Sequence, residues 1–226
     1  MRRTNRSLRH LSLLAAMLVV VLAPASPSHA QAALTRDDIT GPLSRFDTAP
    51  ELDITALRQK ALERSRSRSR NEPDVTKRPP IAPELQNLPS VTLDIEFDTD
   101  TPIVRPQSYE TVGRLADALV HVSLLPYDFL IVGHTDATGR REANVLLSQR
   151  RADAVRDVLV NTFKISSKRI QTIGLGEEQF IDPTHPTSPD NLRTQIVTIA
   201  KEPEQSEQPA ATPVPAAPAK KPSKKR

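Results

Sequence analysis

The feature that most constrains the fold is a series of regular apolar patterns that begins at Val91. The stretch VTLDIEFD, which starts there, alternates apolar and polar residues as a half-buried strand does. Apolar residues then recur at helical spacing over 109–120, and Pro106 suits the first turn of such a helix. The all-apolar run FLIV, at 129–132, is typical of a central strand. This part of the chain is therefore predicted to alternate strand and helix.

Three further patterns complete the order. A long helix is predicted from about Glu142 to about residue 163, and RIQTIGLG and TQIVTIA, at 169–176 and 194–200, are predicted strands separated by a polar, proline-bearing loop. The order strand, helix, strand, helix, strand, strand predicts an α+β sandwich with helices on one face of one sheet. The first strand is expected to lie beside the second.

Composition limits what the rest of the chain can do. Only 3% of the 226 residues are aromatic and 21 are proline, so we predict one packed domain of about 110 residues. The chain has no cysteine, which excludes a disulfide framework, a thiolate metal site and a lipid anchor through an N-terminal cysteine. We therefore expect any attachment of this protein to be noncovalent.

Residues 1–30 have the pattern of a secretory signal peptide. Four arginines come first, an apolar run of about twelve residues follows at 11–22, and SPSHA ends the segment with small residues at the cleavage positions. An uncleaved membrane anchor is the alternative, although this run is short against the roughly twenty residues that span a bilayer. The pattern predicts export and a mature chain that starts at Gln31 and has no transmembrane segment.

The segments on either side of the predicted domain have little apolar patterning. Residues 31–90 are predicted to be a disordered leader and proline/arginine-rich linker, with one short helix through Ile54, Leu57 and Ala61. The run RSRSRSR within it is interpreted as a solvated, self-repelling spacer. Residues 202–226, rich in proline, alanine and lysine, are predicted to be a disordered basic tail.

One arginine in the stretch GHTDATGRREANVLLSQRRADAV stands where an apolar residue is expected. On a helix from about Glu142, Arg151 shares one stripe with Leu147 and Val155, whereas Arg150 faces away from it. An arginine does not shed its charge, and burying it costs several kcal/mol unless a carboxylate and hydrogen bonds compensate. Arg151 is therefore expected to face a partner.

The candidate partners are carboxylates at strand ends. Asp136 follows the second predicted strand, and Asp98 and Asp100 follow the first. Because α/β sheets gather ligand groups at such positions, we expect these carboxylates to converge near Arg151. Carboxylates opposite a guanidinium match a zwitterion that has one amine and one carboxylate. The alternative is an internal salt bridge between Asp136 and Arg151 with no ligand.

This stretch, with IEFDTD before it and DNLRTQIVTIA after it, resembles the OmpA-like C-terminal domain of peptidoglycan-associated lipoproteins and flagellar stator proteins. The resemblance covers about residues 90–201. It implies a βαβαββ sandwich with one mixed sheet over 91–201. It also implies noncovalent binding of peptidoglycan through the diaminopimelate of the stem peptide.

The resemblance also implies roles for individual residues. Asp136 matches the residue that binds the ligand's ammonium, and Arg151 the one that binds its carboxylate. Asn191 and Arg193 match supporting residues of the late motif, in which Leu192 replaces an arginine. The full set of expected ligand-binding residues is Asp136, Arg151, Asp98, Thr99, Asp100, Thr135 and Asn144.

The sequence offers no pattern for catalysis or for a cofactor. His134 has no second histidine at metal-ligand spacing and is interpreted as a turn-stabilising residue. The sequence has no set of nucleophile and base residues that suggests a hydrolase. We therefore expect that the protein is not an enzyme. About sixty residues between signal peptide and domain are too few for an eight-stranded outer-membrane barrel.

We therefore expect a periplasmic protein, associated with the cell wall or the outer membrane, that tethers to peptidoglycan. The leader or tail remains available for an envelope protein partner, and no nucleic acid partner is expected. The alternative is that the basic tail and the arginine/serine run carry the function by binding anionic envelope surfaces or a partner protein. Binding by charge alone would weaken steeply with salt, whereas a pocket for a zwitterion would retain its ligand.

Overall fold

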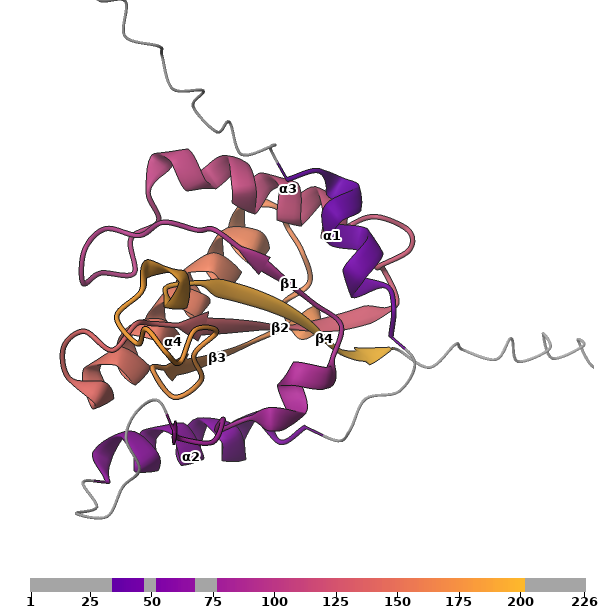
Figure 1. The fold of residues 1–226 in the computed structure, drawn as a ribbon. Coiled ribbons are helices and arrows are strands. Elements are labelled where there is room, and N and C mark those ends of the chain that lie inside the picture. The colour runs from indigo at the N-terminus through magenta and orange to yellow at the C-terminus, as the bar shows by residue number, and fades with distance from the viewer. Residues whose placement is uncertain (1–33, 47–51, 68–76, 202–226) are drawn as a thin grey trace, which may run out of the picture. The chain divides into compact units, whose positions relative to one another are not determined.

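The computed structural model describes residues 34–46, 52–67 and 77–201 (Figure 1). The predicted signal peptide at 1–30 and the predicted tail at 202–226 lie outside the described residues. Within the described ranges, no helix is long and apolar enough to cross a membrane.

Four strands form one mixed sheet in the order β1-β4-β2-β3. β2 pairs in parallel with β3, and β4 pairs antiparallel with both β2 and β1. The α+β class and the order of strands and helices are confirmed. The strands are β1 (Ser90–Leu93), β2 (Tyr127–His134), β3 (Ile170–Gly176) and β4 (Thr194–Lys201).

The prediction that the first strand lies beside the second is wrong, because β4 lies between β1 and β2. β4 presents Ile196 to one face of the sheet and Val197 to the other, and both side chains are fully buried. A strand that is apolar on both sides buries more surface in the middle of a sheet than at its edge. The apolar pattern of the sequence indicates that both faces of this strand are buried. It does not indicate which strands lie beside it.

The two predicted helices cover one face of the sheet, as expected. They are α3 (Tyr109–Leu119), which follows a short 3-10 turn, and α4 (Arg141–Asp157). Leu115 and Val155 of these helices pack with Phe129 and Ile131 of β2 in one apolar cluster. This packing places the second turn and the later turns of α4 over β2 and β3, and so positions Arg151.

Two glycines allow α4 to lie directly on the strand backbones. A Cβ atom on Gly133 would lie 2.3 Å from the Ser148 carbonyl oxygen, and one on Gly174 would lie 2.1 Å from the Gln149 nitrogen. Any larger residue would therefore push the helix away from β2 and β3. The glycine of GHTD is thus a packing requirement of α4, whereas Gly139, with φ +86°, makes the turn that leads into that helix.

The opposite face of the sheet is covered by the leader (Figure 1). Helix α2 (Ile54–Arg66) and the 3-10 turn Pro83–Asn87 contribute Leu57, Ala61 and Leu85 to a second apolar cluster. Their partners in the sheet are Leu130, Val132, Ile173, Leu175, Val197 and Ile199. Helix α1 (Arg36–Leu43) instead adds Ile39 and Leu43 to the first cluster, beside α3.

The expectation of a disordered leader with little core therefore needs correction for its described parts. The predicted short helix is present as α2, but it is packed and not isolated. Few residues of α2 are apolar, so the helical pattern in the sequence is weak. The helix is stabilised by burying these residues against the second apolar face of the sheet. Residues 47–51 and 68–76 lie outside the described residues.

Ion pairs also join the leader to the domain, and part of the arginine/serine run belongs to them. Arg64 of α2 pairs with Glu178 at 3.1 Å, and Arg141 of α4 pairs with the same carboxylate. Arg78 pairs with Glu177 at 3.5 Å. We call these five residues the leader clamp. Arg64 and Arg66 are helical and paired, so the spacer interpretation does not hold for them.

Candidate functional site

The loop after β2 holds Asp136 in a defined position. Its carboxylate, 8% exposed, accepts hydrogen bonds from the backbone N–H of Thr138, at 3.0 Å, and from the Thr138 hydroxyl. The Asn144 amide donates to the carbonyl oxygens of Asp136 and Thr138, at 3.3 and 2.9 Å, and to Glu177 at 2.8 Å. Asn144, 7% exposed, therefore connects the loop to the leader clamp, which suits a supporting role.

Arg151 is half-buried and is held by uncharged groups. Its Nε donates to the Thr101 carbonyl oxygen at 3.1 Å, and its guanidinium lies 5.0 Å from the centre of the Phe97 ring. Burial lowers the pKa of Arg151, while the charges of Asp100 and Asp136 oppose this shift. Among the described residues, no carboxylate forms an ion pair with Arg151, so the internal salt bridge is not formed. Arg150, as expected, is exposed.

The loop after β1 leaves all three of its predicted residues exposed. Asp98 and Thr99 are exposed, and Asp98 pairs with Arg105 at 3.3 Å. Asp100 is also exposed and has a φ of 56°, a left-handed conformation that aspartate tolerates better than most residues. Asp100 and Asn144 line one cavity of about 300 Å³.

Thr135 of GHTD lies inside the fold. It is 2% exposed, its backbone N–H donates to the Gly176 carbonyl oxygen at 3.0 Å, and its buried hydroxyl has no hydrogen-bond partner. The structure thus brings Asp100, Asp136 and Arg151 close enough to act on one another electrostatically. It does not bring the Thr135 side chain to the surface.

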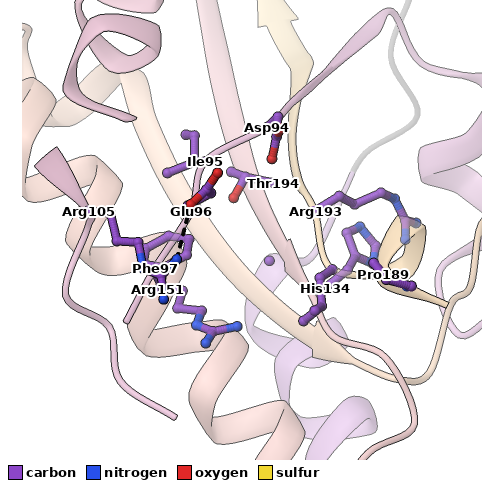
Figure 2. A pocket seen from close by; sticks show the side chains of 12 residues that line it. Asp94, Ile95, Glu96, Phe97, Arg105, His134, Arg151, Pro189, Arg193 and Thr194 are labelled. Atoms are coloured by element: carbon purple, nitrogen blue, oxygen red, sulfur yellow. Dashed lines mark hydrogen bonds and ion pairs between the residues drawn. The ribbon is translucent and has the colours of Figure 1, made fainter. Parts of the chain in front are cut away.

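A second cavity, of about 270 Å³, is lined by Arg151 and lies between the segment that follows β1 and the start of β4. Figure 2 shows the His134 ring and Arg193 on one side of it and Arg105, Phe97 and Arg151 on the other. The complete lining is Asp94, Ile95, Glu96, Phe97, Arg105, Gly133, His134, Arg151, Pro189, Leu192, Arg193 and Thr194.

His134 was not expected to line a cavity. It is 2% exposed, and neither of its ring nitrogens has a hydrogen-bond partner, so the ring does not stabilise a turn. Burial and then the charge of Arg193 lower its pKa well below the usual value, which keeps the ring neutral. The nearby Gln195 side chain and Gln179 backbone oppose the shift but lie outside hydrogen-bond geometry. A lone histidine in a strand carries no sequence signal for this environment.

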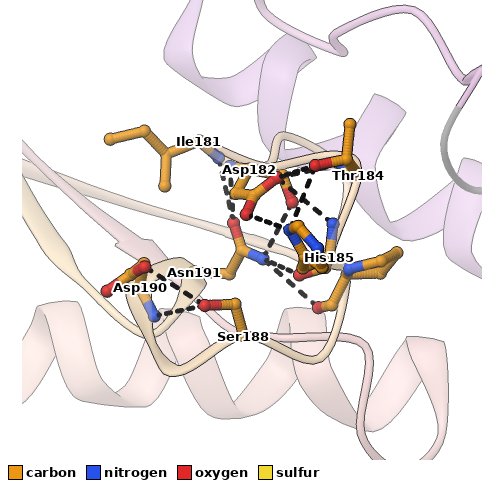
Figure 3. Close-up of polar contacts among 8 residues, drawn as sticks. Ile181, Asp182, Thr184, His185, Ser188, Asp190 and Asn191 are labelled. Atoms are coloured by element: carbon orange, nitrogen blue, oxygen red, sulfur yellow. Dashed lines mark hydrogen bonds and ion pairs between the residues drawn. The ribbon is translucent and has the colours of Figure 1, made fainter.

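Asn191 organises the loop before β4 (Figure 3). Its fully buried amide accepts from the backbone N–H groups of Ile181 and Asp182, at 3.0 and 3.1 Å, and donates to the carbonyls of Asp182, His185 and Pro186. Within the same loop, hydrogen bonds from Thr184 and His185 lower the pKa of Asp182 to about 2. The contacts of Asn191 suit the supporting role expected of it.

Arg193 extends from this loop to the second cavity. It donates to the carbonyl oxygens of Asn191 and Gln179, at 3.3 and 3.1 Å, and burial lowers its pKa to about 10. Leu192, which replaces the arginine of the related pattern, is 43% exposed and lines the cavity. Within the described residues, no group of three or more His, Asp or Glu side chains is arranged to hold a metal ion.

The part of the chain that holds these loops resembles an OmpA-like domain. Residues 96–193 match the family model described as OmpA family. The resemblance inferred from GHTD and the patterns around it is thereby confirmed over this segment.

Among curated proteins, the chain is 37% identical over 97 residues to outer membrane porin F of Pseudomonas aeruginosa, covering 43% of this chain and 27% of that protein. It is 39% identical over 85 residues to the peptidoglycan-associated lipoprotein of Mesorhizobium japonicum, covering 38% of this chain and 49% of that protein. The chain thus spans half or less of the length of these relatives.

Two solved structures show the same type of likeness. The peptidoglycan-associated lipoprotein from Burkholderia pseudomallei is 29% identical, with a TM-score of 0.38 that covers 48% of this chain and 88% of that one. The cell wall anchor of the T6SS from Pseudomonas aeruginosa is 26% identical, with a TM-score of 0.41 over 50% of this chain and 80% of that one.

Proposed function

We propose that this protein binds peptidoglycan noncovalently and tethers part of the cell envelope to the wall, without catalysing a reaction. Asp136 would bind the ammonium of the diaminopimelate side chain, and Arg151 would bind its carboxylate. The protein would act in the periplasm, associated with the wall or the outer membrane, after export. The OmpA family match and the peptidoglycan-associated lipoproteins among its relatives support this proposal.

The observation that carries the proposal is that Arg151 is half-buried without a carboxylate partner among the described residues. Its guanidinium is half-buried and forms no ion pair with a carboxylate of the described chain, although Asp100 and Asp136 are near enough to affect its pKa. A charge that is partly desolvated but not neutralised by the protein is prepared for a charged ligand. Carboxylates beside it add the complementary half of a zwitterion site.

The test is co-sedimentation of the purified full-length protein with isolated sacculi. Asp136→Ala and Arg151→Ala are each expected to lower the bound fraction at least tenfold, because each leaves one charge of the zwitterion unpaired. Arg150→Ala is the matched control, since its side chain is the exposed neighbour on the same helix. Far-UV circular dichroism shows whether each variant is folded.

Two further measurements test the ligand and the mode of binding. Free diaminopimelate should compete with sacculi, whereas Nα-acetyl-lysine amide, whose side chain offers an ammonium but no carboxylate, should not. Binding at about 0.5 M salt should persist; its loss there in the wild type, with no effect of either substitution, would instead favour adhesion through the basic tail. Wall binding by both folded variants at wild-type level would refute the site.

The full chain is the proper material for these measurements. A fragment that begins at residue 90 would lose α1, α2 and the turn Pro83–Asn87, and would expose the second apolar face of the sheet. Each buried Leu or Ile contributes roughly 1.5–3 kcal/mol, so the loss of the leader would remove a large part of the stability.

A further inference from the structure

The segment 177–179, with the sequence EEQ, directly follows β3 and lies between the leader and the candidate site. Its three residues are charged or polar and are nevertheless buried, at 7%, 3% and 7% exposed. Buried groups of this kind need partners, because an unpaired buried charge strongly destabilises the folded state. Each residue of this segment, which we call the bridging segment, has its partners on two sides.

Glu177 joins the leader to the Asp136 loop. On the leader side, its carboxylate pairs with Arg78 at 3.5 Å. On the site side, it accepts a hydrogen bond from the Asn144 amide at 2.8 Å, and the same amide donates to the carbonyl oxygens of Asp136 and Thr138. Thr138 in turn donates its N–H to the Asp136 carboxylate at 3.0 Å. A chain of contacts therefore runs from Arg78 to the carboxylate proposed to bind the ammonium of the ligand.

Glu178 joins the leader to the first turn of α4. Its side chain is fully buried, and its carboxylate pairs with Arg64 of α2 at 3.1 Å. The same carboxylate accepts a hydrogen bond from Nη2 of Arg141 at 2.7 Å. Arg141 is the first residue of α4 and comes two residues after Gly139, which makes the turn into this helix. One carboxylate therefore ties the leader to the start of α4.

Gln179 joins the leader to Arg193. Its side-chain oxygen accepts a hydrogen bond from the N–H of Ala82, a leader residue, at 3.2 Å. Its backbone carbonyl oxygen accepts from Arg193 at 3.1 Å. Each of the three consecutive residues thus contacts the leader on one side and an element of the candidate site on the other.

The leader is also held at a place that does not involve the bridging segment. Arg58 of α2 donates to the Thr172 carbonyl oxygen at 2.7 Å and to Oε1 of Gln149 at 3.2 Å. In addition, α2 buries Leu57 and Ala61 against the second apolar face of the sheet. These contacts keep the leader on the sheet when one contact of the bridging segment is lost. The two kinds of attachment can therefore be separated by substitution.

The candidate site needs such support because its two charged groups lie on different elements. Asp136 lies in the loop after β2, and Arg151 lies on α4. The two charges of a zwitterion have a fixed separation, so binding requires both groups to be held at one spacing. The bridging segment holds the loop through Asn144 and the helix start through Arg141. Leader arginines neutralise the buried carboxylates of this segment, and without them those carboxylates would be drawn toward water.

We propose that the leader is a positioning part of the wall-binding site. When the leader is docked, the bridging segment holds the Asp136 loop, the start of α4 and Arg193 in the arrangement that binds the ligand. Arg64 and Arg78 are then positioning residues, which act through Glu178 and Glu177. The inference rests on the proposed function. Because coupling between two sites is reciprocal, ligand binding also tightens the leader, and a partner that draws the leader away weakens the hold on the wall.

The experiment measures the affinity of the full-length protein for a soluble muropeptide monomer that carries diaminopimelate, by isothermal titration calorimetry. Arg78→Ala is expected to lower this affinity at least fivefold, because Glu177 loses its cation and the Asp136 loop loses its support. Arg78→Lys, which keeps the charge, should restore most of the affinity. Arg58→Ala is the matched control and should change the affinity less than twofold, since its partners lie outside the bridging segment.

Urea unfolding separates positioning from a purely structural role. Both alanine variants remove contacts between leader and domain, so both should unfold at a lower urea concentration than the wild type. A purely structural role would lower the unfolding midpoint of both variants and the affinity of neither. Only a positioning role lowers the affinity of Arg78→Ala alone.

A second measurement tests the reciprocal effect in the wild type. Saturating muropeptide is expected to slow hydrogen exchange of the α2 amides at least fivefold, because ligand binding and leader docking stabilise each other. The amides of α1, which packs in the first apolar cluster beside α3, are the internal reference. A ligand that only stabilises the whole fold would slow exchange in both helices alike.

Three results would overturn the inference and leave the proposed function intact. They are wild-type affinity in folded Arg78→Ala, equal losses of affinity in Arg78→Ala and Arg58→Ala, and equal slowing of exchange in α1 and α2. If Arg78→Ala does not fold, hydrogen exchange in the wild type decides, because it needs no variant. Failure of the wild-type protein to bind the muropeptide overturns the proposed function, and the inference with it.

Discussion

Two regions of this molecule hold half-buried arginines in opposite ways. In the leader clamp, Arg64 and Arg141 meet Glu178, whose side chain is fully buried, and Arg78 meets Glu177. At the candidate site, Arg151 and Arg193 contact carbonyl oxygens and an aromatic ring. The regions lie close together, because Asn144 hydrogen-bonds both to Glu177 and to the Asp136 loop.

The difference separates arginines that carboxylates of the chain neutralise from the two arginines at the candidate site, which have no such partner among the described residues. Carboxylates of the chain neutralise the clamp arginines, so their charges serve the contact between leader and domain. Burial lowers the pKa of Arg193 to about 10 and that of Arg151 below its usual value, and no ion pair within the described residues offsets the burial. Under the proposed function, this cost in stability is given up for binding. The predictions below test this contrast.

The largest effect is expected in the clamp. Glu178→Ala should lower the free energy of unfolding by about 3–5 kcal/mol, because two partly buried arginines lose their shared carboxylate. Urea unfolding followed by circular dichroism measures this change. The matched control is Glu142→Ala, which removes the partner of the exposed Arg66 and should cost less than about 1 kcal/mol. Equal costs for the two variants would contradict the contrast.

The second prediction concerns pH and the uncharged histidine of the site. The folded-state pKa of His134 is lowered, so between that value and its unfolded value of about 6.5 the unfolded chain binds more protons. His134 therefore leaves the free energy of unfolding unaffected above about pH 6.5, where the ring is neutral in both states. As the pH falls below this value, protonation of the unfolded chain lowers the free energy of unfolding. Urea unfolding at pH 8 and pH 5 should show this loss, and His134→Gln should reduce the slope. An unchanged slope would show that the ring does not titrate in this way.

The smallest effect on stability is expected at Arg151. Arg151→Leu loses a cation–π contact, worth roughly 0.5–1 kcal/mol at partly exposed sites, but also removes a charge that burial disfavours. Its unfolding free energy should stay within about 1 kcal/mol of the wild type, although the proposed wall binding should be lost. A cost near that of Glu178→Ala would place Arg151 among the structural arginines.

Much of the fold was readable from periodicity, since burial on one face repeats every second residue in a strand and about every 3.6 residues in a helix. The leader was misjudged because its few apolar residues become buried only against a face formed by distant strands. Arg151 stood out because a charge on an apolar stripe requires compensation. His134 did not, because nothing near it in the sequence reports that its ring nitrogens lie buried and unpartnered.

The order of strands and helices and the choice of Asp136 and Arg151 could be predicted, because they depend on local periodicity and on a compact motif. The place of β4 between β1 and β2, the cover of the leader on the second face, and the opening of the sheet between Ile95 and Leu192 became visible only in the packed fold. Those outcomes depend on which distant surfaces bury one another, and hydrophobic burial carries no record of sequence position.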